Sequence, residues 1–321
     1  MNRRIFSTLW SLMQRELWES PGSFKWTPAG IIALTIFFVA VGLIFSLRVD
    51  NELVFTLDAI RQFSTVDMEQ KRLFMSGALF AVSAMFFQIM LLVLLFYLSS
   101  CLYDERKDRS ILFWKSLPVS DSMTVMSKLL TACLLAPLLY LAAVIITQLV
   151  LLATASVYGF MAGVNPLTTF WLPAQLPNLW TIMALGLVVQ ALWLLPVYAW
   201  LMFCSSWAPR VPILVAVIVP AIVAMLQHVW SLLLSFSTPD TNIGWIILKR
   251  LGSGMLPNNI SWQVGGNGET EMADVEFSQD VFMSYSNSLE YLARPDMWLG
   301  LAVAAVLLAG AIWFRRRAAD S

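Results

Sequence analysis

The sequence predicts an all-α integral membrane protein with six transmembrane helices, an N-terminal amphipathic elbow helix and both termini in the cytoplasm. The first observation is composition, because 59% of the 321 residues are hydrophobic and only 12% are charged, whereas a soluble domain carries about a quarter charged residues. The second is that charge is missing in blocks as long as the roughly 20 residues that a helical span requires. The third is that Lys and Arg gather on alternate connections between these blocks.

Six uncharged, apolar segments are the predicted spans. The uncharged stretch 129–209 is too long for one crossing and is interrupted by several glycines and prolines, so we expect it to cross twice. Arg210, between Pro209 and Pro212, then marks a short turn, because proline ends helices. The six segments are Trp26–Leu47, Leu73–Ser100, Leu129–Val157, Leu179–Ser205, Val211–Phe236 and Met297–Phe314.

The basic residues set the orientation. With the N-terminus inside, 13 of the 20 Lys and Arg residues lie on the inner side and 7 on the outer side. The excess of inner positive charge places both termini in the cytoplasm. The chain then divides into an elbow helix at 1–25, a transmembrane domain at 26–314 with an inner loop at 101–128 and an outer loop at 237–296, and a cytoplasmic tail at 315–321.

The first 25 residues predict an amphipathic helix at the membrane surface. Apolar side chains between Ile5 and Leu17 share one helical face, and polar side chains share the other. Glu16 falls inside the apolar arc, where a carboxylate against lipid would be costly, so we expect it to face protein or a helix end. A plain membrane anchor and a functional elbow are both compatible with this pattern.

Several classes of function find no support in the composition. The 20 Lys and Arg residues balance the 20 Asp and Glu residues, so no basic surface indicates a nucleic-acid partner. Cys101, Cys133 and Cys204 lie in or beside apolar runs, which favours neither a disulfide framework nor a metal site. We identify no set of catalytic residues.

The predicted spans carry a few uncharged polar side chains and one imidazole. None of the six segments contains Asp, Glu, Lys or Arg, although ion-coupled transporters place ionisable groups at this depth. One interpretation is that the polar groups form interhelical hydrogen bonds of about 1 kcal/mol each. The other is a path for a neutral or weakly polar substrate, with Gln88, Gln148, Gln190, Gln227 and His228 as candidates.

The inner loop after the second segment combines charge with aromatic residues. A mixed-charge run at 103–109 leads into Phe113-Trp114-Lys115-Ser116-Leu117-Pro118-Val119-Ser120, and Lys128 opens the next span. This pattern resembles the inner loop of type-2 ABC-transporter permeases, a family of six-helix exporters. The helix around Arg15-Glu16-Leu17-Trp18-Glu19 resembles the elbow of that family. Arg109-Ser110 departs from the pattern, because relatives often carry Gly-Thr there.

The resemblance implies a partner that hydrolyses ATP. In such permeases the inner loop forms a coupling helix on a separate ATPase subunit, and two permease protomers, here a homodimer, work with two ATPase subunits in the bacterial inner membrane. ATP and Mg would bind to the ATPase, and this chain, which has no Gly-x-x-x-x-Gly-Lys-Ser/Thr loop, would hold no cofactor. The predicted coupling residues are Glu16, Glu105, Arg106, Arg109, Trp114 and Leu117.

The expected function is therefore a non-catalytic permease subunit that exports an apolar or amphipathic substrate across the bilayer. A first alternative is a mechanical transmitter that uses ATP-driven motion to act on a periplasmic or extracellular partner. Its contact would be the outer loop, which has 8 acidic and 3 basic residues and includes an apolar stretch at 243–256, interfacial or re-entrant. A second alternative, an intramembrane enzyme, lacks a catalytic set.

Overall fold

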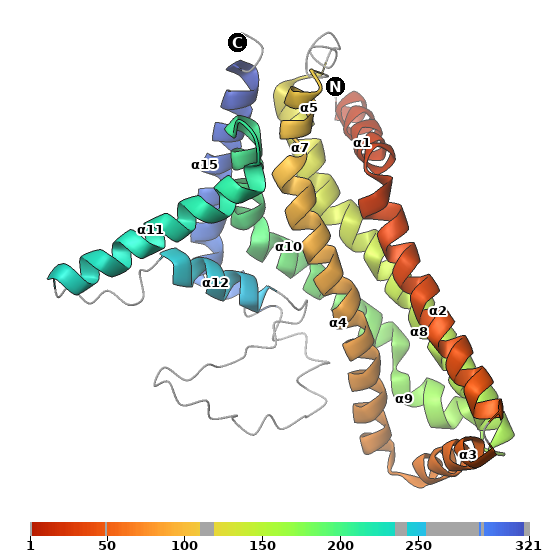
Figure 1. Ribbon diagram of the computed structural model, residues 1–321. Helices are drawn as coiled ribbons and strands as arrows, with labels where there is room; N and C mark the ends of the chain where they lie inside the picture. Colours follow the sequence, from red (N-terminus) through yellow and green to blue (C-terminus); the bar gives the residue numbers. More distant parts are fainter. Residues whose placement is uncertain are drawn as a thin grey trace.

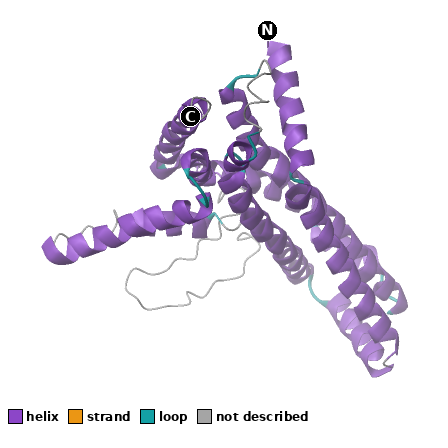
Figure 2. Ribbon diagram, turned by 45° about the horizontal axis from the view of Figure 1, so that its top comes forward, coloured by secondary structure: helices purple, strands orange, loops and turns teal. Residues whose placement is uncertain are grey.

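The structure, a computed structural model, describes residues 2–48, 50–109, 119–234, 243–254, 289 and 292–317. The described chain is helical and contains no strand (Figures 1 and 2). Its principal helices are α1 (Asn2–Glu19), α2 (Thr27–Arg48), α3 (Asp50–Thr65), α4 (Met68–Ser100), α5 (Tyr103–Lys107), α7 (Asp121–Leu130), α8 (Ala136–Met161), α9 (Leu172–Ala174), α10 (Leu176–Trp207), α11 (Pro212–Leu234), α12 (Ile243–Ser253) and α15 (Pro295–Arg317).

The prediction of six membrane-crossing helices is confirmed in number within the described residues. Six helical stretches are long and apolar enough to cross a membrane, and each overlaps one predicted segment. They are Gly22–Ser46, Met68–Lys107, Asp121–Met161, Leu167–Trp207, Pro212–Trp230 and Pro295–Arg317. The chain therefore has the architecture of a multi-pass membrane protein.

Several helices are longer than the uncharged segments because polar residues extend and cap them. The Asp67 side chain accepts a hydrogen bond from the Glu69 amide at the start of α4, and the Ser120 side chain accepts one from Met123 at the start of α7. Such caps satisfy amides that have no partner within the helix. A charged residue therefore ends an uncharged segment without ending the helix that contains it.

The core lies where α4, α8, α10 and α15 pack together. α10 packs against α15 and α4, while α2 packs along α8 (Figure 1). Because lipid tails are as apolar as these side chains, close packing and interhelical hydrogen bonds hold such helices together. Side chains almost completely buried in this core include Phe86, Phe87, Leu94, Leu98, Tyr140, Val144, Leu179, Met183 and Leu194.

The two ends of the helices differ in what they carry. Both termini lie at one end, together with α1, α5 and α7, and α3 lies at the other end (Figure 1). We call the first the termini end. α11 starts beside α10 and α4 and extends to one side, away from α2 and α8 (Figures 1 and 2), and few residues of its span are buried. The three cysteines are free.

Candidate functional site

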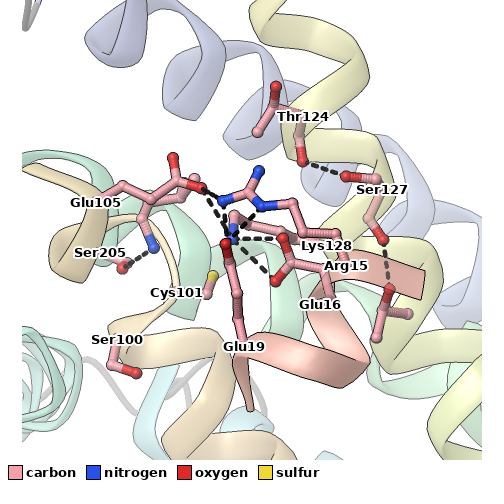
Figure 3. Close-up of polar contacts among 12 residues, drawn as sticks. Arg15, Glu16, Glu19, Ser100, Cys101, Glu105, Thr124, Ser127, Lys128 and Ser205 are labelled. Carbon is pink, nitrogen blue, oxygen red and sulfur yellow. Dashed lines mark hydrogen bonds and ion pairs between the residues drawn. The ribbon is translucent and has the colours of Figure 1, made fainter. Parts of the chain in front are cut away.

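Charged side chains from four helices are buried together at the termini end. Glu16 comes from α1, Glu105 from α5, Lys128 from α7 and Arg315 from α15 (Figure 3 shows the first three). Their exposed fractions are 2%, 6%, 2% and 3%, respectively. Buried charges are rare unless they are paired. We refer to these four residues as the charge cluster.

Glu16 holds α1 to α7 and α4. Lys128 Nζ donates hydrogen bonds to both carboxylate oxygens of Glu16, at 2.8 and 2.9 Å, and Tyr97 Oη donates to Glu16 Oε2 at 2.7 Å. Leu12 and Met13, one turn earlier on α1, are buried on the same side, as the helical period requires. The expectation that Glu16 faces protein is confirmed.

Glu105 connects α5 to α7, α15 and α1. Lys128 Nζ lies 3.1 Å from Glu105 Oε1, and Arg315 Nη1 donates to Glu105 Oε2. Arg15 Nη2 reaches Glu105 Oε1 at 3.4 Å, and Arg315 Nε donates to Asp121 Oδ1 at 3.1 Å. One carboxylate therefore receives cationic donors from three other helices.

The charge cluster is electrically balanced, with two carboxylates, one ammonium and one guanidinium. Balance matters because the cost of removing these groups from water is recovered only when each charge keeps its partners. Loss of one member leaves an uncompensated buried charge, which costs about 3–5 kcal/mol in proteins. The four helices are therefore held in one relative position, because separating these buried charges has a large cost in free energy.

Arg106 fixes the turn between α4 and α5 to the end of α10. Its Nη2 donates to the carbonyl oxygens of Ser205 and Ala208, at 2.9 and 2.8 Å. In return, Ser205 Oγ accepts hydrogen bonds from the amides of Leu102 and Tyr103, at 3.1 and 3.0 Å. These bonds satisfy carbonyls and amides that the helix ends would otherwise leave without partners. The start of the inner loop is thus attached to α10 as well as to the charge cluster.

The predicted coupling residues occupy different environments. Glu16 and Glu105 belong to the charge cluster, and Arg106 follows Glu105 on α5. The contacts that the structure gives these three residues are with other parts of this chain. Arg109 is exposed just after α5, with a left-handed φ of 55°. Trp114 and Leu117 fall within 110–118, outside the described residues.

Sequence reasoning missed some of the cations and acids that complete the site. From the sequence, Lys128 is only part of the inner-loop pattern and the start of a span, and Arg315 is only one of the inner basic residues. Asp121 and Tyr97 are not among the predicted site residues. The available signal was Glu16 inside an apolar arc, because a buried carboxylate requires a cation. Which cation it would find depends on contacts between residues far apart in the chain.

The predicted substrate-path residues divide into bonded and exposed groups. Gln148 Nε2 donates to Ser83 Oγ, and its Oε1 accepts from Trp180 Nε1, which joins α4, α8 and α10. Gln190 donates to the carbonyl of Gly254, and Gln227 accepts from the amide of Ile243. Gln88 and His228 are exposed. Gln148, Gln190 and Gln227 thus make hydrogen bonds between different segments of the chain, as in the interpretation that these groups hold helices together. The path for a substrate stays a prediction.

Taken together, the fold and the charge cluster define a class of protein: a multi-pass helical membrane protein whose helices are ion-paired at the termini end. Comparison with protein-family models, with curated proteins and with solved structures gave no match for this chain.

Proposed function

We propose that this chain is the permease subunit of an ATP-driven ABC transporter, coupled to a separate ATPase through the inner loop 101–128. The observation that carries the proposal is the position of Glu105 at the start of that loop, bonded to Lys128 and Arg315. A force applied to the loop would move α7 and α15 with it, because separating the buried charges costs more than moving the helices together.

The distribution of charge supports an inward position for the inner loop. Arg315, Arg316 and Arg317 lie at the termini end with α5 and α7. Basic residues accumulate on the cytoplasmic side of membrane proteins. We therefore propose that the termini end faces the cytoplasm, where a soluble ATPase could reach the loop.

The position of the charged residues in the spans also favours a separate ATPase as the source of energy. In the six described spans, the Asp, Glu, Lys and Arg residues lie toward the helix ends, whereas ion-coupled transporters hold such groups near mid-membrane. A chain built in this way has no evident route for using an ion gradient. Its motion would be driven from outside the chain, through a surface such as the one that bears Arg109.

The coupling residues take two roles in this proposal. Glu16, Glu105 and Arg106 are positioning residues that keep the loop attached to the helices. Arg109 contacts the ATPase directly, together with Trp114 and Leu117. The exposed apolar surfaces of α2 and α11 suit a second permease protomer and the lipid bilayer. The substrate we propose is apolar or amphipathic.

Co-purification tests the proposal. The tagged chain is expressed with its neighbouring reading frames, extracted in mild detergent and assayed for ATP hydrolysis in the eluate. We expect an ATP-hydrolysing subunit to co-purify in amounts close to those of the chain, and Arg109→Glu to reduce its retention. Arg48→Glu, an exposed change in the last turn of α2 at the opposite end, is the matched control. A chain that purifies alone would contradict the proposal.

A mechanical transmitter remains a second candidate because α10 connects both ends of the protein. The C-terminal end of α10 is hydrogen-bonded to Arg106, and Gln190 of α10 is hydrogen-bonded to Gly254 of the outer loop. Gly254 is the last described residue before 255–288. An external partner retained by the wild-type chain and lost when residues 255–288 are replaced by a glycine-serine linker would favour the transmitter over the exporter.

A further inference from the structure

The C-terminal ends of α10 and α15 lie together at the termini end, and the charges that these two helix ends carry are positive. α15 packs along α10, and a Cβ added at Gly310 of α15 would come within 2.8 Å of the Phe203 ring on α10. α10 and α11 contain no acidic residue, and the acid of α15, Asp296, lies at its other end. The cations are Arg210, in the turn between α10 and α11, and the last three residues of α15.

Only part of this positive charge is neutralised within the described chain. Arg315 is paired with Glu105 and Asp121. Arg210 and Arg317 are exposed, and neither forms an ion pair or a hydrogen bond with any described residue. Prolines at 209 and 212 restrict the backbone of the turn that presents Arg210. Two uncompensated guanidinium groups therefore remain on this surface.

Five aromatic side chains connect the two helix ends. On α10, the Phe203 ring stacks on Trp200, with centroids 5.9 Å apart, and its centroid lies 6.5 Å from that of Trp207. Between α10 and α15, Phe203 meets Phe314 edge-on at 5.8 Å, and Phe314 meets Trp313 edge-on at 4.8 Å. The five side chains thus form one continuous row, which we call the aromatic row.

The two arginines extend the aromatic row at its ends. The guanidinium of Arg317 lies 3.8 Å from the centroid of the Trp313 ring, a contact in which the aromatic face attracts the cation. Arg210 follows Trp207 by three residues. Trp207 and Trp313 are 37% and 46% exposed, and their Nε1 groups donate to no described residue. Each end of the row therefore combines a cation with an available indole donor.

This surface lies where three membrane-crossing stretches end. Arg210 lies between the span that ends at Trp207 and the span that begins at Pro212, and Arg317 is the last residue of a third span. Beside them, the first turns of α11 expose apolar side chains, including Leu214 and Val217. Indole rings favour the boundary between hydrocarbon and headgroups, and arginines at the ends of spans reach the phosphates. The surface thus offers cations, donors and apolar contact in the order that a phospholipid requires.

We propose that this surface binds an anionic phospholipid. Arg210 and Arg317 contact the phosphate, the indoles of Trp207 and Trp313 donate to oxygens of the headgroup or the glycerol esters, and an acyl chain lies along the start of α11. A zwitterionic lipid also has a phosphate, but its ammonium group would be repelled by the two arginines. The binding of the lipid does not depend on the proposed function, because it needs only the bilayer.

The test is lipid photo-crosslinking to the full chain in nanodiscs, without any partner. The discs contain phosphatidylglycerol and phosphatidylcholine in equal amounts, and one or the other carries a diazirine near the headgroup end of an acyl chain. Mass spectrometry of the digested chain gives the ratio of phosphatidylglycerol to phosphatidylcholine crosslinks at residues 199–218 and at α2. α2 is a strict reference, because exposed cations, Lys25 and Arg48, also flank its apolar surface, and its start lies across α7 from α15 (Figures 1 and 2).

We expect the ratio at residues 199–218 to be at least about tenfold above that at α2, because each arginine beside an anionic lipid contributes about fivefold in affinity. Arg210→Gln with Arg317→Gln should reduce the ratio to the α2 value. Trp313→Leu, which leaves the net charge unchanged, should lower it about threefold through loss of the cation–π contact. Lys25→Gln with Arg48→Gln is the charge-matched control and should leave the ratio at residues 199–218 as in wild type.

Equal ratios at residues 199–218 and at α2 would show that positive charge attracts anionic lipid without a defined site, and would overturn the proposal. A ratio that survives the double arginine variant would overturn it as well. If that variant keeps its lipid ratio but no longer retains a co-purified ATPase, the surface is a protein contact and the lipid site is wrong. Because the nanodiscs contain no ATPase, neither result of this test decides the proposed function.

Discussion

Lys128 is the residue on which the termini end depends most. Its ammonium contacts both Glu16 and Glu105 and is 2% exposed. This cation lies between two carboxylates that would otherwise repel each other in a region with little water, and Arg315 and Arg15 complete the pairing of Glu105. The site tolerates its buried charges because this residue lies between them.

Lys128→Met tests this role. The substitution keeps most of the length of the side chain and removes the charge, so both carboxylates lose a partner and we expect the free energy of unfolding to fall by about 3–5 kcal/mol. Thermal unfolding in nanodiscs measures the effect. Lys25→Met is the matched control, because Lys25 is exposed and such changes usually shift stability by about 0.5 kcal/mol or less. An equal loss of stability in both variants would show that the buried ion pairs of Lys128 stabilise the protein no more than an exposed lysine does.

Adding Glu16→Gln to Lys128→Met gives a stricter version of the same test. The double variant removes one carboxylate with the cation, so it should be more stable than Lys128→Met alone, since interacting residues show non-additive changes in stability. If the two substitutions simply add, the ion pair between these side chains does not stabilise the protein.

At the scale of elements, the inner loop and α10 are joined by Arg106. Its Nη2 donates to two carbonyls near the end of α10, and hydrogen bonds from a charged donor contribute about 1.5–3 kcal/mol each. α10 also contacts α12 near its middle. A displacement of α5 can therefore reach the outer loop along one continuous helix with a proline inside it.

Arg106→Met should free α5 from α10. The amides of residues 101–109 should then exchange hydrogen at least about tenfold faster, because local opening loses two hydrogen bonds. Hydrogen exchange followed by mass spectrometry on peptides from this segment gives the measurement. Arg109→Met, three residues along and exposed, should leave the exchange rates near those of wild type. Protection that survives Arg106→Met would show that other contacts hold the turn.

Much of the helical layout could be predicted from sequence, and the reason is physical. A bilayer demands about 20 residues without charge for each crossing, so the six spans are visible in the chain. Several of the spans were predicted too short, because capping by Asp67 and Ser120 lets polar residues continue a helix. The helix α3 was not predicted, since its 16 residues mix charge with apolar groups.

The charge cluster could be predicted only in part. Glu16 was expected to face protein because lipid is a poor neighbour for a carboxylate. Its partners lie 81 and 112 positions away, and Arg315 lies 210 positions from Glu105. Such pairings are set by how the helices pack, which hydropathy does not report.

At the scale of the whole molecule, the two ends of the helices carry different elements and side chains. The termini end carries the charge cluster, the exposed Arg109 and the described parts of the inner loop, and the other end carries α3. α11, although apolar, has few residues buried by the rest of the described chain, which suits contact with lipid or with another protein.

The proposed orientation predicts which end can be labelled from each side. Single cysteines at Lys107→Cys and Asp58→Cys, both exposed, are treated in intact cells with a membrane-impermeant maleimide, after the native cysteines are replaced by alanine. We expect labelling at position 58 only, and labelling at both positions after permeabilisation. Labelling of position 107 in intact cells would reverse the orientation and place the inner loop beyond the reach of a cytoplasmic ATPase.

The central claim is that a separate ATPase docks on the inner loop at the termini end. The most direct measurement is photo-crosslinking in cells that express the chain with its neighbouring reading frames, with a photoreactive amino acid at Arg109 in one variant and at Phe55 of α3 in another, both exposed. The account predicts a crosslinked product containing an ATP-hydrolysing subunit from position 109 and none from position 55. No ATPase product from position 109, or one from position 55 instead, would contradict it.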